Sequence, residues 1–376
     1  MKILVSGDFV ITDNYEKKDL IDTSVQNLFS NSDYRILNLE APVTSLDHKQ
    51  ILKTGPYLRC NYEVVLNALN KLKINLLTLA NNHILDYGNQ GLKDTLSFCK
   101  DNNFNWVGVG DNRKLANTAK RIVKGDVQIS IINLAENEWA NATENSPGSN
   151  PLDLIDNVNL IKKEKKESDF VFVIVHAGNE YNRLPSPNMK KRLRFFAENG
   201  ADLIICHHTH CISGFETYKN VPIYYGIGNF LFTKSSSYND WYNGLTVEIT
   251  IRNNVLATKQ IFTTQDESDF CVSLAKGKKL QKLKDKFHEL SLIINDNIEL
   301  NKEWNKYVDY KKNSFLKLWS PYTFISNRYI KSILLRLGFK FRSKLPLSVF
   351  LNNMRCESHN ELSIAILENE LKKTKN

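Results

Sequence analysis

Several features that mark particular classes of protein are missing from this chain. No stretch approaches the ~20 apolar residues that a membrane-spanning helix needs, so the sequence predicts no such helix. The six cysteines include no Cys-x-x-Cys pair, which argues against a zinc knuckle or a disulfide framework, and we expect reduced thiols. Met1-Lys2 leads into a short apolar stretch that Gly7-Asp8 interrupts, too short for a secretory signal. We therefore expect a cytoplasmic protein.

Acidic residues are missing from one long window. Between Tyr310 and Cys356 there is no Asp or Glu but there are ten Lys and Arg, so the remaining 40 basic residues nearly balance the 41 acidic ones. Aromatic and aliphatic residues interleave with these cations. Such a segment can lie on an anionic membrane surface or hold an anionic partner, or it can be a helix packed on the main domain with its lysines in water. Nucleic acid is not expected, because no nucleic-acid-binding motif accompanies the charge.

The remaining composition is that of an ordinary folded protein. With 42% hydrophobic and 24% charged residues among 376, the chain is not globally disordered and is long enough for one large domain plus an extension. We expect a first domain over residues 1–265 and a helical, basic extension over residues 266–376. The polar segment 136–151 is predicted to be a long surface loop near the site.

Apolar runs and helical patterns alternate through the first domain, which favours a layered α/β fold. A hairpin is expected at Asn253-Asn254, and helices are expected at 266–312 and 361–373. The predicted strands are 2–6, 34–39, 75–80, 105–109, 128–134, 170–175, 202–206, 222–227, 245–252 and 255–263.

Six of these apolar runs end in residues that bind metals or transfer protons. In open α/β sheets, sites form at the carboxyl ends of strands, so six such ends indicate one shared site, and a metal centre is its expected occupant. Taken singly, each residue has a simpler interpretation as a turn residue or a buried, hydrogen-bonded side chain. The residues are Asp8, Glu40, Asn82 with His83, His176, His207 with His208 and His210, and Asn229.

The order of these motifs resembles the calcineurin-like metallophosphoesterase superfamily, and their detailed strings resemble its poly-γ-glutamate capsule synthesis (CapA-type) family. The resemblance covers roughly residues 1–262. The strings are Ser6-Gly7-Asp8, Asn38-Leu39-Glu40-Ala41-Pro42, Ala80-Asn81-Asn82-His83-Ile84-Leu85-Asp86, His176-Ala177-Gly178-Asn179-Glu180-Tyr181, Cys206-His207-His208-Thr209-His210 and Gly226-Ile227-Gly228-Asn229-Phe230.

The resemblance implies a four-layer α/β/β/α sandwich and a site for divalent metal ions, two of them, of the manganese, iron or zinc type. It implies that His83 assists the leaving group. One departure stands out: the superfamily begins its site with Asp-x-His, but Asp8-Phe9-Val10 has no histidine. The first metal site can therefore lack a ligand. The implied metal ligands are Asp8, Glu40 (the bridging position), Asn82, His176, His208 and His210.

Further residues of these strings lie near the implied ligands. Asp86, three residues after His83, can orient its ring and is a second catalytic candidate. Glu180 can bind metal, substrate or another site residue. The remaining substrate or supporting candidates are Asn229, His207 and Arg59, each of which also has a purely structural interpretation.

The functional expectation is a metal-dependent hydrolase of phosphoesters that acts in making a capsule or another cell-surface polymer. Its substrate would be an anionic small molecule or polymer. Through residues 311–355 it would contact an anionic membrane surface, on the inner face, or a capsule-assembly partner. The alternative is a non-hydrolytic component of a capsule or polyglutamate assembly complex, which the incomplete first motif favours.

Overall fold

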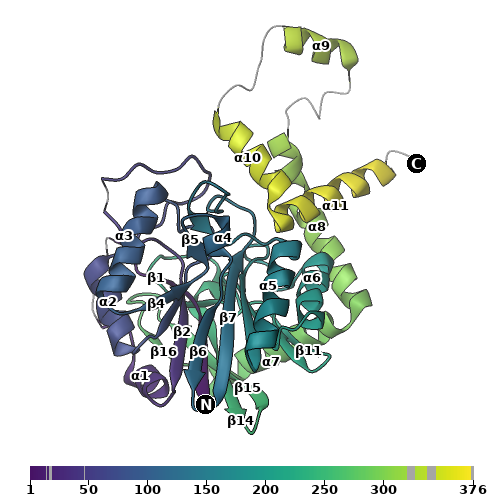
Figure 1. Cartoon of the computed structure of the whole chain (residues 1–376). Helices are drawn as coiled ribbons and strands as arrows, with labels where there is room; N and C mark the ends of the chain where they lie inside the picture. Colours follow the sequence, from purple (N-terminus) through teal and green to yellow (C-terminus); the bar gives the residue numbers. More distant parts are fainter. Residues whose placement is uncertain (14, 17–18, 46, 320–326, 337–343, 374–376) are drawn as a thin grey trace.

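The computed structural model describes residues 1–376 apart from 14, 17–18, 46, 320–326, 337–343 and 374–376. Within these ranges no helix is both long and apolar enough to cross a membrane. Two sheets lie at the centre with helices on both outer sides, and a further group of helices follows at the C-terminal end (Figure 1).

The first sheet has a parallel half and an antiparallel half. Its strand order is β16-β15-β14-β1-β2-β3-β4, and β13 pairs with the end of β1. Strands β1 to β4 are parallel, whereas β14 and β15 form the predicted hairpin around Asn253-Asn254. The strands are β1 (Lys2–Val10), β2 (Tyr34–Leu39), β3 (Leu76–Thr78), β4 (Asn105–Val107), β13 (Asn229–Phe232), β14 (Asn243–Arg252), β15 (Val255–Gln265) and β16 (Val272–Leu274).

The second sheet has the order β11-β12-β10-β9-β7-β6 and is parallel from β12 to β7. Its central strands are buried on both faces, which explains their continuous apolar sequences. The edge strands β6 and β11 and the short strand β8 were not predicted, because their polar or brief sequences carry no strand pattern. The predicted strand 105–109 is divided between β4 and β5, which lie in different sheets. The strands are β6 (Lys120–Lys124), β7 (Val127–Ala135), β9 (Phe170–His176), β10 (Leu203–His207), β11 (Phe215–Tyr218) and β12 (Val221–Tyr224), beside the pair β5 (Val109–Gly110) and β8 (Gly148–Ser149).

Three hydrophobic cores separate four layers, which confirms the α/β/β/α prediction. Alternate residues of β1 point to different cores: Ile3 and Val5 pack against the second sheet, and Leu4 packs under the outer helices. The third core lies between the second sheet and its helices. The outer helices are α1 (Thr23–Ser30), α2 (Tyr62–Lys71) and α3 (Gly88–Asp101) on the first sheet, and α5 (Leu154–Glu167) and α6 (Pro187–Glu198) on the second (Figure 1).

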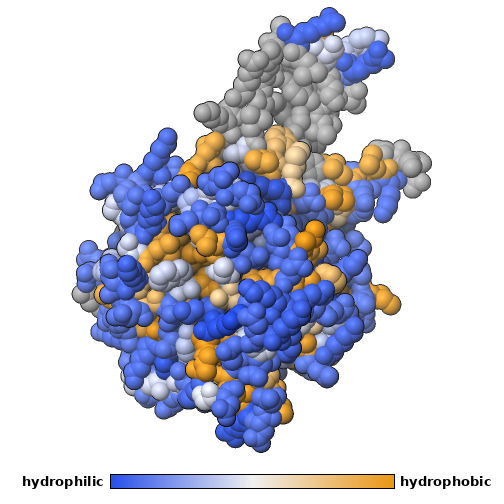
Figure 2. Space-filling view, viewed as in Figure 1, coloured by the Kyte–Doolittle hydropathy of each residue, from blue (hydrophilic) through white to orange (hydrophobic). Residues whose placement is uncertain are grey.

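The C-terminal extension consists of helices. The first begins at Gly277, and β16 before it still belongs to the first sheet, so the sheet continues past residue 265. A small core of Val308, Leu362 and Ile366 joins two of these helices, and Figure 2 shows apolar surface where the extension meets the body. The helices are α7 (Gly277–Asn295), α8 (Asn297–Trp319), α9 (Arg328–Arg336), α10 (Lys344–Arg355) and α11 (Glu357–Lys373); part of the basic window lies outside the described residues.

Segment 136–151 is not the surface loop that its polar sequence predicts. Its middle, 143–145, is exposed, but Glu136, Glu138 and Asn150 are buried. Backbone hydrogen bonds tie the segment to β7 and β5, and two of its carboxylates face the extension. A polar composition predicts exposure to solvent, but these polar side chains have partners inside the protein.

Candidate metal centre

The predicted ligands lie at neighbouring strand ends of the two sheets. Asp8 sits in β1 just after a register shift, and Glu40 directly follows β2. In the second sheet His176 of β9 is paired with His207 of β10. Gly7 permits this arrangement, because a Cβ there would overlap the carbonyl oxygen of Gly228.

The turn after β10 holds its backbone in an uncommon conformation. His208 has φ 86° and His210 has φ 55°, both in the left-handed region that non-glycine residues rarely adopt. The backbone N–H of His208 donates to Asp8 Oδ2 at 3.2 Å, and His210 Nδ1 lies 2.9 Å from Asn229 Oδ1. Strained backbone held by such contacts is common at functional sites.

Two groups of three donors share one carboxylate. Asp8, Glu40 and His210 form the first group, and Glu40, His176 and His208 form the second; within each group the donor atoms lie within 4.8 Å of one another. Glu40 Oε1 is 3.3 Å from His176 Nε2 and 3.8 Å from His210 Nε2. The structure therefore puts Glu40 between two potential cation positions, which is the geometry of a bridging ligand.

Glu40 has no hydrogen-bond partner on either carboxylate oxygen among the described residues, although it is completely buried. A buried carboxylate without a partner costs several kcal/mol, and a bound cation removes that cost. Carboxylate, imidazole and amide donors together suit divalent transition metals. The residues present therefore fit the divalent cations that the sequence predicts.

Burial and mutual repulsion shape the proton affinities of the ligands. Burial and the nearby Glu40 raise the pKa of Asp8 to about 6, and burial raises the pKa of Glu40. Burial and His176 lower the pKa of His208 to about 3, and burial, with His207 next, lowers the pKa of His176 well below its usual value. At neutral pH these two imidazoles are thus neutral, which is the form that binds metals.

Asn82 connects this centre to a residue that sequence reasoning missed. Its Oδ1 lies 3.1 Å from His176 Nε2, and its Nδ2 donates to Glu138 Oε2 at 3.1 Å. Glu138 Oε1 is in turn 3.7 Å from His208 Nε2. No local pattern marked Glu138, because it follows no predicted strand directly and sits in a segment of polar composition.

His83 belongs to a buried network of three charged or titratable side chains. Its Nδ1 is 2.7 Å from Asp86 Oδ2 and 3.1 Å from Lys53 Nζ, and Lys53 also forms an ion pair with the other Asp86 oxygen. Burial lowers the pKa of Lys53, an effect that Asp86 opposes. Lys53 was missed in the sequence, where a lysine in a polar stretch has no distinguishing signal.

Of the remaining predicted residues, three lie at the centre or in its pocket and one lies away from the pocket. His207 is buried, and its Nε2 lies 3.1 Å from the Ser6 carbonyl oxygen. The side chain of Asn229 contacts His210 Nδ1. Glu180 lines the pocket beside the centre. Arg59 does not line that pocket: its guanidinium pairs with Asp13 and donates to the Thr44 carbonyl oxygen at 3.2 Å.

The place of the missing histidine is taken by Val10, whose side chain is fully buried in the first core. In the described part of the chain no other His, Cys, Asp or Glu joins Asp8, Glu40 and His210 as a ligand group. The first group thus offers three such side chains, where a histidine at position 10 would offer a fourth.

A pocket of about 300 Å³ opens over His83 and Asn82. Its other walls come from Lys53 to Pro56, from Trp139, and from Glu180 and Tyr181. The extension supplies the outer wall with residues from α8, α10 and α11, namely Tyr307, Lys311, Phe315, Asn352, His359 and Leu362.

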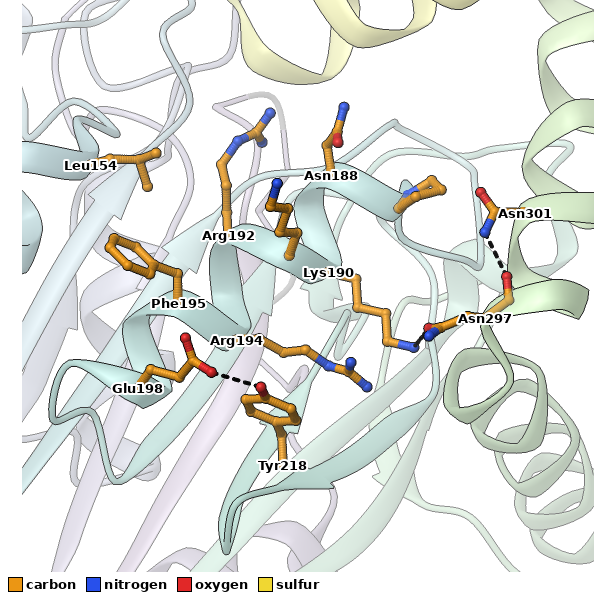
Figure 3. A pocket seen from close by; sticks show the side chains of 12 residues that line it. Leu154, Asn188, Lys190, Arg192, Arg194, Phe195, Glu198, Tyr218, Asn297 and Asn301 are labelled. Carbon is orange, nitrogen blue, oxygen red and sulfur yellow. Dashed lines mark hydrogen bonds between the residues drawn. The ribbon is translucent and has the colours of Figure 1, made fainter.

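A larger hollow of about 720 Å³ beside α6 lacks such a ligand group (Figure 3). Three of its four lysines and arginines already have partners within the protein. Lys190 Nζ contacts Asn297 Oδ1 at 2.8 Å, Arg194 pairs with Glu216, and Arg192 pairs with Glu361. The small pocket at the strand ends is therefore the better candidate for chemistry.

The fold and this centre define a class: two stacked sheets whose strand ends converge on a cluster of carboxylate and imidazole side chains that could hold metal ions. Residues 2–234 match the model of the bacterial capsule synthesis protein PGA_cap family, and the chain belongs to that family. The extension lies outside the matched residues.

Named relatives agree with this assignment. The chain is 34% identical over 222 residues to the capsule biosynthesis protein CapA of Bacillus anthracis, covering 57% of this chain and 54% of that protein. It is 34% identical over 219 residues to the PGA biosynthesis protein CapA of Bacillus subtilis (strain 168), covering 57% of each. The chain thus spans about half the length of the curated relatives it matches.

Solved structures with a related arrangement are more distant. A novel phosphatase from Mycoplasma pneumoniae is 14% identical with a TM-score of 0.42, covering 72% of this chain and 95% of that one. A hypothetical protein from Thermus thermophilus is 12% identical with a TM-score of 0.45, covering 71% of this chain and 100% of that one.

Proposed function

We propose that the protein is a metal-dependent phosphoester hydrolase that acts in the synthesis of a capsule or another cell-surface polymer. The observation that carries the proposal is Glu40, a buried carboxylate shared by two ligand groups and without a hydrogen-bond partner in the described structure. The family and its capsule-related relatives support the biological role.

Each part of this chemistry has a residue in position to perform it. Asp8, Glu40, Asn82, His176, His208 and His210 would hold two divalent cations, which when bound supply charge neutralisation and an acidified water. His83 lines the pocket and would hold the proton that the leaving group needs. Asp86 fixes the orientation of the His83 ring, and Lys53 adds positive charge where an anionic substrate would sit.

The test measures metal content and hydrolysis separately. Elemental analysis of the purified protein is followed by assays of an aryl phosphodiester and an aryl phosphomonoester with added manganese. We expect bound metal and metal-dependent turnover. His208→Ala should lose the metal that His208 holds and should abolish turnover, whereas His83→Ala should keep the metal and lose turnover. His288→Ala, which changes a histidine of α7 outside the ligand groups, is the matched control.

A second candidate function is that of a non-hydrolytic component of a capsule or polyglutamate assembly complex. The three-donor first group, with Val10 in place of a histidine, favours it. Bound metal without turnover of either phosphoester, in wild-type protein that is folded by circular dichroism, would refute the hydrolase and leave this function in its place.

A further inference from the structure

A third cluster of metal-binding side chains lies where the extension meets the first domain. Glu138, Cys356 and His359 offer donor atoms that all lie within 4.8 Å of one another. Cys356 follows the end of α10 and His359 lies in the first turn of α11, more than 200 residues after Glu138. These two residues are therefore brought to the centre only by the docking of the extension.

The cluster is buried and rich in potential negative charge. Cys356 is 0% exposed and Glu138 is 5% exposed. Cys356 Sγ lies 3.8 Å from Glu138 Oε1 and 3.5 Å from Oε2 of a second buried carboxylate, Glu136. Among the described lysines and arginines, none forms an ion pair with Glu136 or Glu138. Glu138 has His208 Nε2, at 3.7 Å, as its ion-pair partner, and a buried carboxylate so placed is further stabilised by a bound cation.

The spacing of the donors suits a small tetrahedral ion. With a zinc–sulfur bond of about 2.3 Å and a zinc–oxygen bond of about 2.0 Å, tetrahedral ligands lie about 3.5 Å apart. The observed 3.8 Å between Sγ and Oε1 is close to that separation. A donor set of sulfur, imidazole nitrogen and carboxylate oxygen selects zinc over harder cations such as magnesium.

Neighbouring groups hold two of the three ligands in place. Asn82 Nδ2 donates to Glu138 Oε2 at 3.1 Å, which leaves Oε1 directed to the thiol. The side-chain amide of Asn352 lies 3.2 Å from His359 Nδ1 and orients the ring. Supporting contacts of this kind are the usual surroundings of metal ligands.

We propose that Glu138, Cys356 and His359 form a zinc site, distinct from the two groups that share Glu40, whose open fourth position faces the substrate pocket. Glu138 and His359 both line that pocket, so a ligand in the pocket could reach the ion. A zinc ion here also clamps α10 and α11 to the first domain, and so fixes the outer wall of the pocket. The matched family residues end at 234, so two of the three ligands belong to the extension of this chain.

The test replaces zinc in the full-length protein with cobalt(II) and records the absorption spectrum. A cobalt ion bound to a cysteine thiolate shows a sulfur-to-metal charge-transfer band in the near ultraviolet, whereas sites with only oxygen and nitrogen ligands show none. We expect this band in the wild-type protein. Elemental analysis should show about one equivalent less zinc in Cys356→Ser and in His359→Ala than in the wild type.

Two variants make the result specific. Cys271→Ser, at the one cysteine of the six that is not buried, should keep the band and the full zinc content. His210→Ala, which changes a residue of a different ligand group, should keep the band and the zinc held by Cys356. The band reports on Cys356 whether or not any phosphoester is hydrolysed. Absence of the band would reject the zinc site and leave the proposed function standing, whereas absence of turnover would reject the hydrolase and leave the zinc site standing.

The proposal is overturned if the cobalt-loaded wild type shows no thiolate band, or if the band survives in Cys356→Ser. Should Cys356→Ser fail to fold, the wild-type spectrum and the His359→Ala variant decide: no band in the wild type, or an unchanged band and zinc content in His359→Ala, rejects the site.

Discussion

The strand-end centre and the C-terminal extension reach the same pocket by different means. Asp8, Glu40 and His176 are placed by paired strands with fixed register inside a fully buried core. The extension instead consists of helices that pack on the outside of the first domain, α7 against β11 and α8 against α6. The sheets therefore carry the donors whose geometry must be fixed, and the extension supplies the outer wall of the pocket.

Several contacts that dock the extension lie at the start of α11. Glu357 accepts a hydrogen bond from the backbone N–H of Asn137 at 2.9 Å, and the hydroxyl of Ser358 donates to Glu136 at 2.6 Å. Glu361 pairs with Arg192 of α6. Because these contacts adjoin Glu138, the docking of the extension and the shape of the pocket are coupled.

The largest effect should come from Glu40→Gln, which removes the carboxylate common to both ligand groups. We expect loss of the metal held by these two groups and a fall in phosphoester turnover of about 10³-fold, because charge neutralisation at the reacting group disappears. Glu216→Gln is the matched control: Glu216 is also buried but pairs with Arg194, so metal content should not change. Full metal content in Glu40→Gln would contradict the bridging role.

The next effect concerns the metal-free protein and pH. Because the folded-state pKa of Asp8 is raised from 3.8 to about 6, its contribution to stability is fully present below pH 3.8 and is lost as pH rises through about 6. The loss amounts to about 3 kcal/mol. Urea unfolding with a chelator should show this decline.

Two comparisons make the pH prediction specific. Asp8→Asn should lack this part of the decline, and saturating manganese should remove it from the wild type, because the cation stabilises the ionised carboxylate. Identical pH profiles for chelated wild type and Asp8→Asn would contradict the prediction.

A smaller effect is expected at Lys53, which contacts both His83 and Asp86. Lys53→Met should lower turnover about 10- to 100-fold and leave metal content unchanged, because Asp86 and His83 lose the cation that holds them. Lys49→Met, at an exposed lysine nearby, is the control. Equal activity of the two variants, measured with the same substrate, would show that Lys53 has no such role.

The smallest effect tests the extension as a membrane-facing surface. In α9, Tyr329, Ile330 and Ile333 are exposed beside Arg328 and Arg336. We expect the protein to sediment with anionic vesicles, and Arg328→Gln with Arg336→Gln to weaken this by about 1 kcal/mol per cation.

The control for this experiment is Lys302→Gln with Lys306→Gln in α8, where both lysines pair with glutamates. This pair of changes should alter vesicle binding less. If the wild type sediments no more with anionic than with neutral vesicles, the surface does not serve this purpose.

Much of the first domain was predictable, because its strands are buried on both faces and read as continuous apolar runs. The hairpin at Asn253-Asn254 and the central strands lie where expected. Edge strands such as β6 were missed, since more than half of the residues of β6 are exposed. The segment around Glu138 was misjudged because composition does not reveal whether a polar side chain has a partner.

The sequence by itself determined the fold class, the family, and the residues at the strand ends, because apolar runs and the motifs that follow them are local patterns. Only the tertiary structure decided that Glu40 lies between two ligand groups, that Lys53 joins His83, and that Cys356 faces Glu138. Those contacts join residues up to 218 positions apart. The local sequence around each residue does not indicate a contact over that separation.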